Sequence, residues 1–307
     1  MRRTDLLSVF DEQRGLLLGV AYRLLGSLAD AEDVVQETWL RWSSVDLDSI
    51  DDPRAFLVRV TTRLGLDRLR RIKARREDYV GPWLPEPVLT APDVAEDIER
   101  AESISLALIV VLETLTPLER AVFVLREVFG FSHAEMAEVL DRSEVAVRQL
   151  AARARSHVHE RRPRFEADRK VRLNVTQRFL SACATGDLAG LLAVLAPGVT
   201  LINDGGGQKL GARLPVHGAR AVSSFLLSIS RGPTIARYLG LEPGEPLPPV
   251  RSSVADINGG PAIILYVDER PIAVIALDVA DDLIQLVRLI SSPDKLSRLA
   301  SDVRDMR

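Results

Sequence analysis

The chain has 307 residues, 47% of them hydrophobic and 27% charged, with one cysteine and a formal net charge of −3. This size and composition predict two or three folded domains with apolar cores and exclude a disordered chain. A single cysteine excludes an internal disulfide and a cysteine-based zinc site, and it fits a reducing compartment. No apolar run reaches the ~20 residues that span a bilayer, and charges interrupt any signal-peptide core. We therefore expect a cytoplasmic protein.

The charges are segregated along the sequence. Residues 54–76 hold nine basic side chains and one acid, residues 77–102 hold eight acids and one base, and residues 142–164 hold seven arginines and two acids. Nucleic acid is bound by local basic surface rather than by net charge. Two basic blocks separated by an acidic stretch therefore make nucleic acid a candidate partner in spite of the small negative net charge.

Residues 1–76 form the first expected domain, and their apolar spacing predicts helices only. The predicted helices cover about 6–25, 30–42 and 52–76, each with apolar residues at helical spacing. Opposite the apolar stripe of the second helix lie Asp33, Gln36, Glu37 and Leu40. That side is either an ordinary solvated face or a docking face for a basic partner helix, with Leu40 as its anchor.

The third predicted helix ends in a basic tail that contains Arg68, Arg70, Arg71, Arg75 and Arg76. Such a tail either keeps the protein soluble or lies on nucleic-acid phosphates, and a nearby DNA-binding motif favours the second interpretation.

Residues 77–103 are predicted to be an acidic, proline-rich linker. Three prolines and one glycine between Tyr79 and Val88 exclude a regular helix or a sheet interior. The linker contains Trp83, Leu84 and Pro85, and the first two side chains are costly to expose to water. A docking site for them is therefore favoured over a free coil.

Residues 104–164 are predicted to contain a helix-turn-helix. Thr116–Glu119 and Ser132–Glu135 have the sequence of capping boxes, and Ser143 suits the cap of a last helix running to about His159. On that helix Val147, Leu150, Ala151, Ala154 and Val158 are expected to face inward. The outer side carries groups suited to base edges and phosphates, namely Arg148, Gln149, Arg153, Arg155 and Ser156. A solvated, arginine-rich helix end is the alternative.

Residues 170–307 predict an α+β domain. Two short helices, a strand near 199–202 and a helix near 219–230 precede four β-rich stretches between 250 and 290, which suggest an antiparallel meander. Candidate acid–base residues are Asp204, His217, Asp256 and Asp278, but their spacing assembles no catalytic set. We therefore expect no enzymatic activity, no cofactor and no metal, and we favour a small-molecule ligand bound without turnover.

Several of these segments resemble one family. Residues 30–42, continued by 53–71, are similar to region 2 of the sigma-70 family in its extracytoplasmic-function (ECF) branch. Residues 115–117 and 143–150 are similar to region 4. Residues 83–87, 204–207 and 292–296 resemble motifs of ECF sigma factors that carry a fused SnoaL-like domain, which is a cone-shaped α+β fold of the nuclear-transport-factor-2 group. Ser292 stands where that group has asparagine.

The resemblance implies two all-α domains, a region 2 bundle and a region 4 helix-turn-helix, followed by a regulatory SnoaL-like domain at 170–307. Asp33, Gln36, Glu37 and Leu40 would dock on the largest subunit of core RNA polymerase. The helix at 54–76, including Arg63, would open and read the −10 element of promoter DNA, and the helix at 144–159 would read the −35 element. Thr62 and Arg63 replace the Arg-Asn pair of many members, so their −10 preference is not carried over.

The resemblance also implies regulatory contacts between domains. They would involve Trp83, Leu84 and Pro85 in the linker, the turn Asp204, Gly205, Gly206 and Gly207, and Pro293, Asp294 and Lys295 near the C-terminus. We expect the glycines to allow close backbone approach to the sigma part. The alternatives are a one-component helix-turn-helix regulator independent of polymerase, which leaves the region-2-like helices unexplained, and a weakly enzymatic cone.

Overall fold

The computed structural model describes residues 3–46, 50–76, 81–90, 105–161, 167–206, 214–230, 232–242, 244–297 and 299. The chain divides into two compact units, one of Met1–Asp78 with Leu108–Arg162 and one of Tyr79–Ala107 with Pro163–Arg307. The first is helical and the second combines helices with a sheet, so the expected fold class is confirmed. The two helical segments share one unit, and the connector, which we define as residues 81–90, belongs to the α+β unit.

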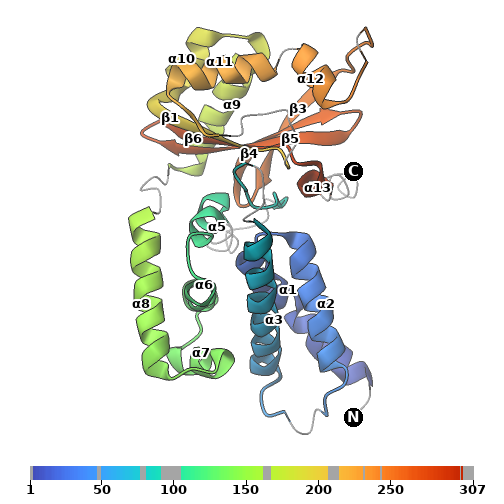
Figure 1. The fold of residues 1–307 in the computed structure, drawn as a ribbon, viewed down its shortest axis with the longest axis vertical. Helices are drawn as coiled ribbons and strands as arrows, with labels where there is room; N and C mark the ends of the chain where they lie inside the picture. The colour runs from blue at the N-terminus through green and yellow to red at the C-terminus, as the bar shows by residue number, and fades with distance from the viewer. Residues whose placement is uncertain are drawn as a thin grey trace. The chain divides into compact units, whose positions relative to one another are not determined.

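The helical part follows the predicted order (Figure 1). Its elements are α1 (Arg3–Leu25), α2 (Leu28–Trp42), α3 (Pro53–Arg76), α5 (Leu106–Leu112), α6 (Pro117–Phe123), the π-helical turn η2 (Val124–Val128), α7 (His133–Leu140) and α8 (Glu144–Arg161). Both predicted capping boxes are confirmed, at Thr116 before α6 and at Ser132 before α7. Within the described residues, no helix is both long enough and apolar enough to cross a membrane.

Buried polar side chains tie the helices of this unit together. The Thr38 and Thr61 hydroxyls, on α2 and α3, lie 3.1 Å apart in the interior. The Trp42 ring is fully buried, and its Nε1 donates to the backbone oxygen of Leu6 at 2.9 Å. Arg120 of α6 is also fully buried and donates through Nε to the carbonyl of Arg23 in α1 at 2.8 Å. The bonds of Thr38 and Trp42 hold α2 with its apolar stripe inward, which leaves its opposite side in solvent.

The α+β unit contains a six-stranded sheet in the order β2-β1-β6-β5-β4-β3. Its elements are α9 (Arg169–Thr185), α10 (Leu188–Val194), β1 (Leu195–Asp204), β2 (Val216–His217), α11 (Ala219–Ile229), α12 (Gly232–Tyr238), β3 (Val250–Ile257), β4 (Gly260–Val267), β5 (Arg270–Ala280), β6 (Leu283–Ile290) and α13 (Pro293–Leu296). Strands β3 to β6 form the predicted antiparallel meander. The sequence analysis missed α12, the two-residue strand β2, and the parallel pairing of β1 with β6.

Different elements pack on the two faces of the sheet. Helices α9, α10 and α11 lie over one face, and the connector and α13 lie on the other (Figure 1). Since side chains alternate between faces along a strand, consecutive residues of β1 point to opposite faces of the sheet. Asn203 faces the helices and lines a cavity there, whereas Asp204 contacts the connector.

Candidate functional sites

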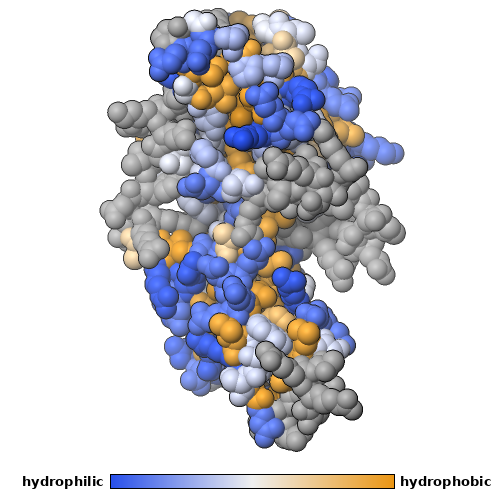
Figure 2. Space-filling model, turned by 90° about the vertical axis from the view of Figure 1, so that its right-hand side faces the viewer, coloured by the Kyte–Doolittle hydropathy of each residue, from blue (hydrophilic) through white to orange (hydrophobic). Residues whose placement is uncertain are grey.

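One exposed side of α2 carries all four residues predicted to form a docking face. Asp33, Gln36, Glu37 and Leu40 are exposed, and Leu40 retains 61% of its surface. The opposite side of the helix is buried through Ala31, Val34, Val35, Thr38 and Trp42. On the visible face of the helical unit, Figure 2 shows separate apolar patches within a hydrophilic surface. An exposed leucine beside the carboxylates of Asp33 and Glu37 is suited to bind a partner that is both apolar and basic.

Two of the arginines of α3 that were predicted to bind DNA have partners within the helical unit. Arg63 donates through Nε to the backbone oxygen of Val139 in α7 at 3.3 Å. Arg68 pairs with Asp30 at 2.6 Å and with Asp33 at 3.1 Å, and the hydrogen bond to Asp30 raises the pKa of Arg68. The sequence analysis expected both arginines to contact DNA and did not anticipate these internal partners.

The rest of the tail is more accessible where it is described. Arg70 is exposed and pairs with Asp67 on the same helix at 2.6 Å, and Arg71 is exposed as well. The side chains of Arg75 and Arg76 lie outside the described residues. Exposed cations therefore remain in the C-terminal third of α3.

Helix α8 has the two sides that its sequence predicted. The inward set is confirmed, because Val147, Leu150, Ala151, Ala154 and Val158 are all buried. The outward set is exposed throughout, comprising Arg148, Gln149, Arg153, Arg155 and Ser156. The turn before α8 is tight: Asp141 adopts a positive φ of 54°, and Ser143 Oγ accepts from the backbone of Ala146 at 3.3 Å. This geometry is that of a helix-turn-helix.

The exposed arginines of α8 have acidic neighbours. Arg148 lies 2.5 Å from Glu144, Arg155 lies 3.3 Å from Glu127, and Arg153 lies 3.7 Å from Glu119. Burial of Glu119 opposes its ionisation, but hydrogen bonds from Thr116 and the nearby charges of His157 and Arg153 outweigh burial and lower its pKa. The Arg148–Glu144 and Arg155–Glu127 pairs are exposed, and such pairs contribute about 0–1 kcal/mol, so a phosphate can replace either glutamate at little cost.

In the α+β unit, the connector is held by Asp204 and Lys295. Asp204 is fully buried, and its Oδ2 accepts from the backbone nitrogen of Leu84 at 2.7 Å and from Lys295 Nζ at 2.5 Å. Lys295 Nζ also donates to the Leu84 carbonyl at 2.5 Å and lies 4.3 Å from the centroid of the Trp83 ring. We call Trp83, Leu84, Asp204 and Lys295 the connector clasp. Leu84 is 1% exposed within it.

The glycine turn after Asp204 serves the clasp in a way that the sequence analysis did not predict. Gly206 has a φ of +68°, and its nitrogen donates to Asp204 Oδ1 at 3.1 Å. A Cβ on Gly206 would lie 2.6 Å from Ser292 Oγ, so the close approach is to Ser292 of the same unit. The expectation that these glycines face the sigma part is not supported at Gly206, and Gly207 lies outside the described residues.

The other residues predicted to be regulatory surround the clasp. Pro85 is buried, and Gly205 is half-buried beside Asp204. Pro293 and Asp294 are exposed and form the first turn of α13, which carries Lys295.

The connector is also hydrogen-bonded to the end of β3 and the turn after it, which the sequence did not predict. The backbone nitrogen of Val88 donates to Asn258 Oδ1 at 3.0 Å, and the Asn258 nitrogen donates to the Val88 oxygen at 2.8 Å. Thr90 bonds to the backbone of Asp256 and Gly259. The sequence marked Asn258 as a turn residue, which it is, with a φ of +51°, but no local signal predicts that its amide holds a segment 170 residues away.

The candidate acid–base residues all have structural partners. Asp204 belongs to the clasp, His217 Nδ1 lies 3.1 Å from Thr200 Oγ1, Asp256 pairs with Arg169 at 2.5 Å, and Asp278 bonds to the buried Arg288. The four are not brought together. In the described part of the chain, no group of three His, Cys, Asp or Glu side chains is placed to hold a metal ion.

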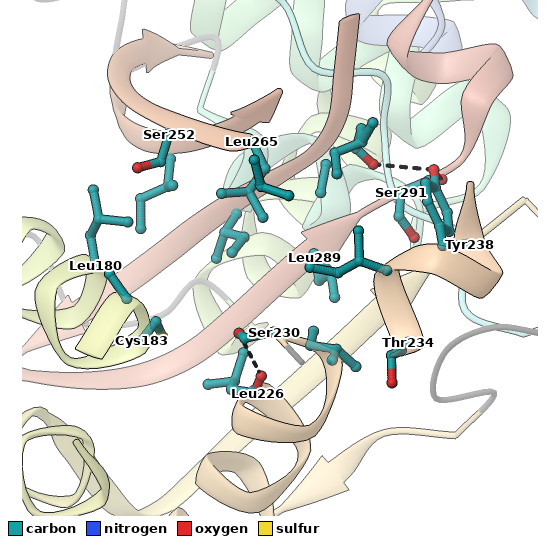
Figure 3. A pocket seen from close by; sticks show the side chains of 18 of the residues that line it. Leu180, Cys183, Leu226, Ser230, Thr234, Tyr238, Ser252, Leu265, Leu289 and Ser291 are labelled. Carbon is teal, nitrogen blue, oxygen red and sulfur yellow. Dashed lines mark hydrogen bonds between the residues drawn. The ribbon is translucent and has the colours of Figure 1, made fainter. Parts of the chain in front are cut away.

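A cavity of about 350 Å³ opens between the helices and the sheet of the α+β unit (Figure 3). None of the four candidates lines it, and among the described residues no carboxylate or histidine does. Cys183 and Tyr238 do line it. Burial raises the pKa of Cys183 to about 12 and raises the pKa of Tyr238, so neither ionises near neutral pH. The cavity is suited to binding rather than to acid–base or nucleophilic chemistry.

Comparison with known proteins relates both units to one family. Residues 9–76 match the family described as Sigma-70 region 2, and residues 105–158 match Sigma-70, region 4. The ECF RNA polymerase sigma factor SigJ of Mycobacterium tuberculosis is 40% identical over 297 residues, covering 95% of this chain and 93% of the relative. The probable ECF sigma factor SigI of the same species is 32% identical, covering 94% of each chain. The crystal structure of SigJ has a TM-score of 0.71 and 36% identity, covering 95% of this chain and 98% of that chain.

The tight packing at Gly206 gives a stability prediction. Gly206→Ala should destabilise the α+β unit by roughly 1–3 kcal/mol, because the new Cβ meets Ser292 and the backbone stays at positive φ. Gly198→Ala is the matched control, since a Cβ there has no neighbour within 4 Å. Urea unfolding of both variants measures the difference. Equal midpoints would show that the turn can relax away from Ser292.

Proposed function

The chain belongs to the ECF RNA polymerase sigma factors of the sigma-70 family, and from this membership we propose that it binds core RNA polymerase and directs it to promoter DNA. The observation that carries the proposal is that the similarity spans almost the whole chain and includes both regions 2 and 4. The mechanism is recognition and strand opening by non-covalent contacts, without a catalytic group of the chain's own. The direct test is transcription from a defined promoter with purified core polymerase. A polymerase-independent regulator would fail this assay and would not co-purify with core polymerase.

The exposed side of α2 is the proposed polymerase contact. Its carboxylates would steer association with a basic surface, and Leu40 would supply the desolvated anchor that carries most of the binding energy. Leu40 supports this role because it is exposed in the isolated chain while the other side of the helix is committed to the core.

Leu40→Arg should therefore abolish binding to core polymerase and leave the fold intact. Replacing an apolar anchor residue by a charged one should cost at least ~2 kcal/mol of binding free energy, as for interface hot spots. Leu188→Arg is the control, because Leu188 is an equally large exposed leucine, at 46%, in the other unit. Binding is measured by titration of labelled core polymerase. Wild-type affinity for the Leu40 variant would remove α2 from the proposed interface.

Helix α8 is the proposed reader of the −35 element. Gln149 and Arg153 are of the types that form paired hydrogen bonds with adenine and guanine, and both project from its exposed side. Arg148, Arg155 and Ser156 are exposed on the same helix, and they are the proposed phosphate contacts. On α3 we propose Arg70, Arg71, Arg75 and Arg76 as contacts near the −10 element, whereas Arg63 and Arg68 would have to give up internal partners to take part.

If Arg153 reads a base, Arg153→Ala should cost roughly 1–3 kcal/mol in promoter binding, concentrated at one position of the −35 element. Arg178→Ala, on an exposed position of α9, is the control. The measurement compares binding of the polymerase complex to a set of promoters with single substitutions. A loss that is uniform over all sequences and reduces the salt dependence would instead make Arg153 a phosphate contact.

We further propose that the C-terminal domain regulates the sigma activity through the connector clasp. The connector lies between regions 2 and 4 in the sequence. Because the C-terminal domain is hydrogen-bonded to the connector, it restricts the path that the chain can take between the two regions. The clasp supports this role because it fixes the backbone of Leu84 on both its N–H and its C=O.

Loosening the clasp should therefore raise transcription. Lys295→Met removes the cation and takes this counter-charge away from the buried Asp204 carboxylate, so the double variant Asp204→Asn with Lys295→Met is the charge-balanced form. Both should exceed wild type in promoter-specific transcription. Lys170→Met, at an exposed lysine, is the control.

Two truncations separate release of the clasp from loss of the domain. A chain ending after Ser292 should be more active than the full-length protein, whereas one ending before Asp204 should be weaker or inactive because a required contact is lost. Equal activity of the full-length protein and both truncated chains would show that the C-terminal domain does not regulate transcription.

A further inference from the structure

The cavity of the α+β unit has the character of a ligand site. Its volume of about 350 Å³ is within the range of small-molecule pockets, which start near ~300 Å³. Figure 3 shows Leu180 and Cys183 near one end and Tyr238 and Ser291 at the other. Its walls are mainly apolar, formed by Phe179, Leu180, Phe225, Ile229, Leu265 and Leu289. An apolar molecule placed against these walls would be partly removed from water.

One polar side chain in the cavity wall has unused hydrogen-bonding capacity. Asn203 is 4% exposed, and its carboxamide has one side-chain contact among the described residues, a long one of 3.4 Å to Ser291 Oγ. An amide can donate two hydrogen bonds and accept two, so most of this capacity is unmet. By contrast, the Tyr238 hydroxyl lies 2.6 Å from the Ser291 carbonyl, and Ser230 donates to Leu226 at 2.8 Å. A ligand atom is the natural partner for Asn203.

The lining restricts the charge of the ligand. A charged group among these apolar walls would lose hydration without gaining a counter-charge. Arg251 also lines the cavity, but side chains alternate along β3, so its side chain lies on the face of Ser253 rather than that of Ser252, where it is 61% exposed and pairs with Glu269 at 3.5 Å. The lining therefore selects a neutral molecule with an apolar body and one hydroxyl or carbonyl group directed at Asn203.

The same wall is bonded directly to the connector clasp. Asn203 and Asp204 are consecutive in β1, one toward the cavity and the other toward Leu84. Ser291 lines the cavity and donates its backbone N–H to the Asp204 carbonyl at 2.8 Å, and the next residue, Ser292, precedes the helix that carries Lys295. No flexible segment separates the two sites.

We propose that this cavity binds a neutral, largely apolar molecule through Asn203, and that its occupancy tightens the connector clasp. Binding fixes Asn203 and Ser291 and so stabilises the ends of β1 and β6 on which Asp204 and α13 depend. The ligand half of the inference stands on the cavity alone, and the regulatory half rests on the proposed function of the clasp.

The ligand class is tested on the full-length protein with naphthalene, 1-naphthol and 2-naphthoate as probes. We expect saturable one-to-one binding of 1-naphthol, about 2- to 12-fold tighter than naphthalene through one hydrogen bond, and weaker binding of the anionic naphthoate. Asn203→Leu should remove the preference for naphthol. Ser252→Trp should block binding, whereas Ser253→Trp should not, since Ser253 is the next residue of β3 and points to the other face.

Coupling is tested by hydrogen exchange of residues 81–90 with and without saturating 1-naphthol. The Leu84 amide should exchange more slowly in the wild type and in the Ser253 variant, and be unchanged in the Ser252 variant. Absence of saturable binding, or equal binding by the two tryptophan variants, overturns the site. Binding with unchanged exchange at Leu84 overturns the coupling. Polymerase is not used, so neither failure can be confused with a failure of sigma activity.

Discussion

The arrangement of the α+β unit depends on one buried carboxylate. Asp204 is fully buried, and such a charge is tolerated only when it is paired and hydrogen-bonded. In the described part of the chain, Leu84, Gly206 and Lys295 each donate a hydrogen bond to it. Each fixes a different part: the connector on the sheet, the turn after β1, and α13. Because loss of any donor leaves the carboxylate undersatisfied, the three parts form one cooperative structure rather than three independent contacts.

Features encoded by nearby residues were predictable from the sequence. The capping boxes at Thr116 and Ser132, the inward side of α8 and the apolar stripe of α2 each depend on side chains within a few turns of one helix. The meander from β3 to β6 was predictable for the same reason, because its strands are joined by short turns. Local spacing also placed the exposed sets on α2 and α8, although it says nothing of what they bind.

Long-range pairings escaped prediction. The parallel pairing of β1 with β6, the grip of Asn258 on Val88 and the internal partners of Arg63 and Arg68 all join distant segments. Basic composition alone cannot show which arginines form internal hydrogen bonds and which remain available to bind DNA. Gly206 is a similar case. A glycine in a turn suggests a positive φ, but the atom that leaves no room for a Cβ belongs to Ser292, which is 86 positions later in the chain. The resemblance identified the clasp residues as important, and only the coordinates show their bonds.

The separation of the clasp partners along the chain has a consequence for biosynthesis. Leu84 and Lys295 are 211 residues apart, and Lys295 lies close to the C-terminal end of this sequence. Chains emerge N-terminus first and fold domain by domain, and distant contacts form late. Regions 2 and 4 are therefore complete before the clasp can close. Until Lys295 has been synthesised, regions 2 and 4 are joined by a connector that the clasp does not yet hold.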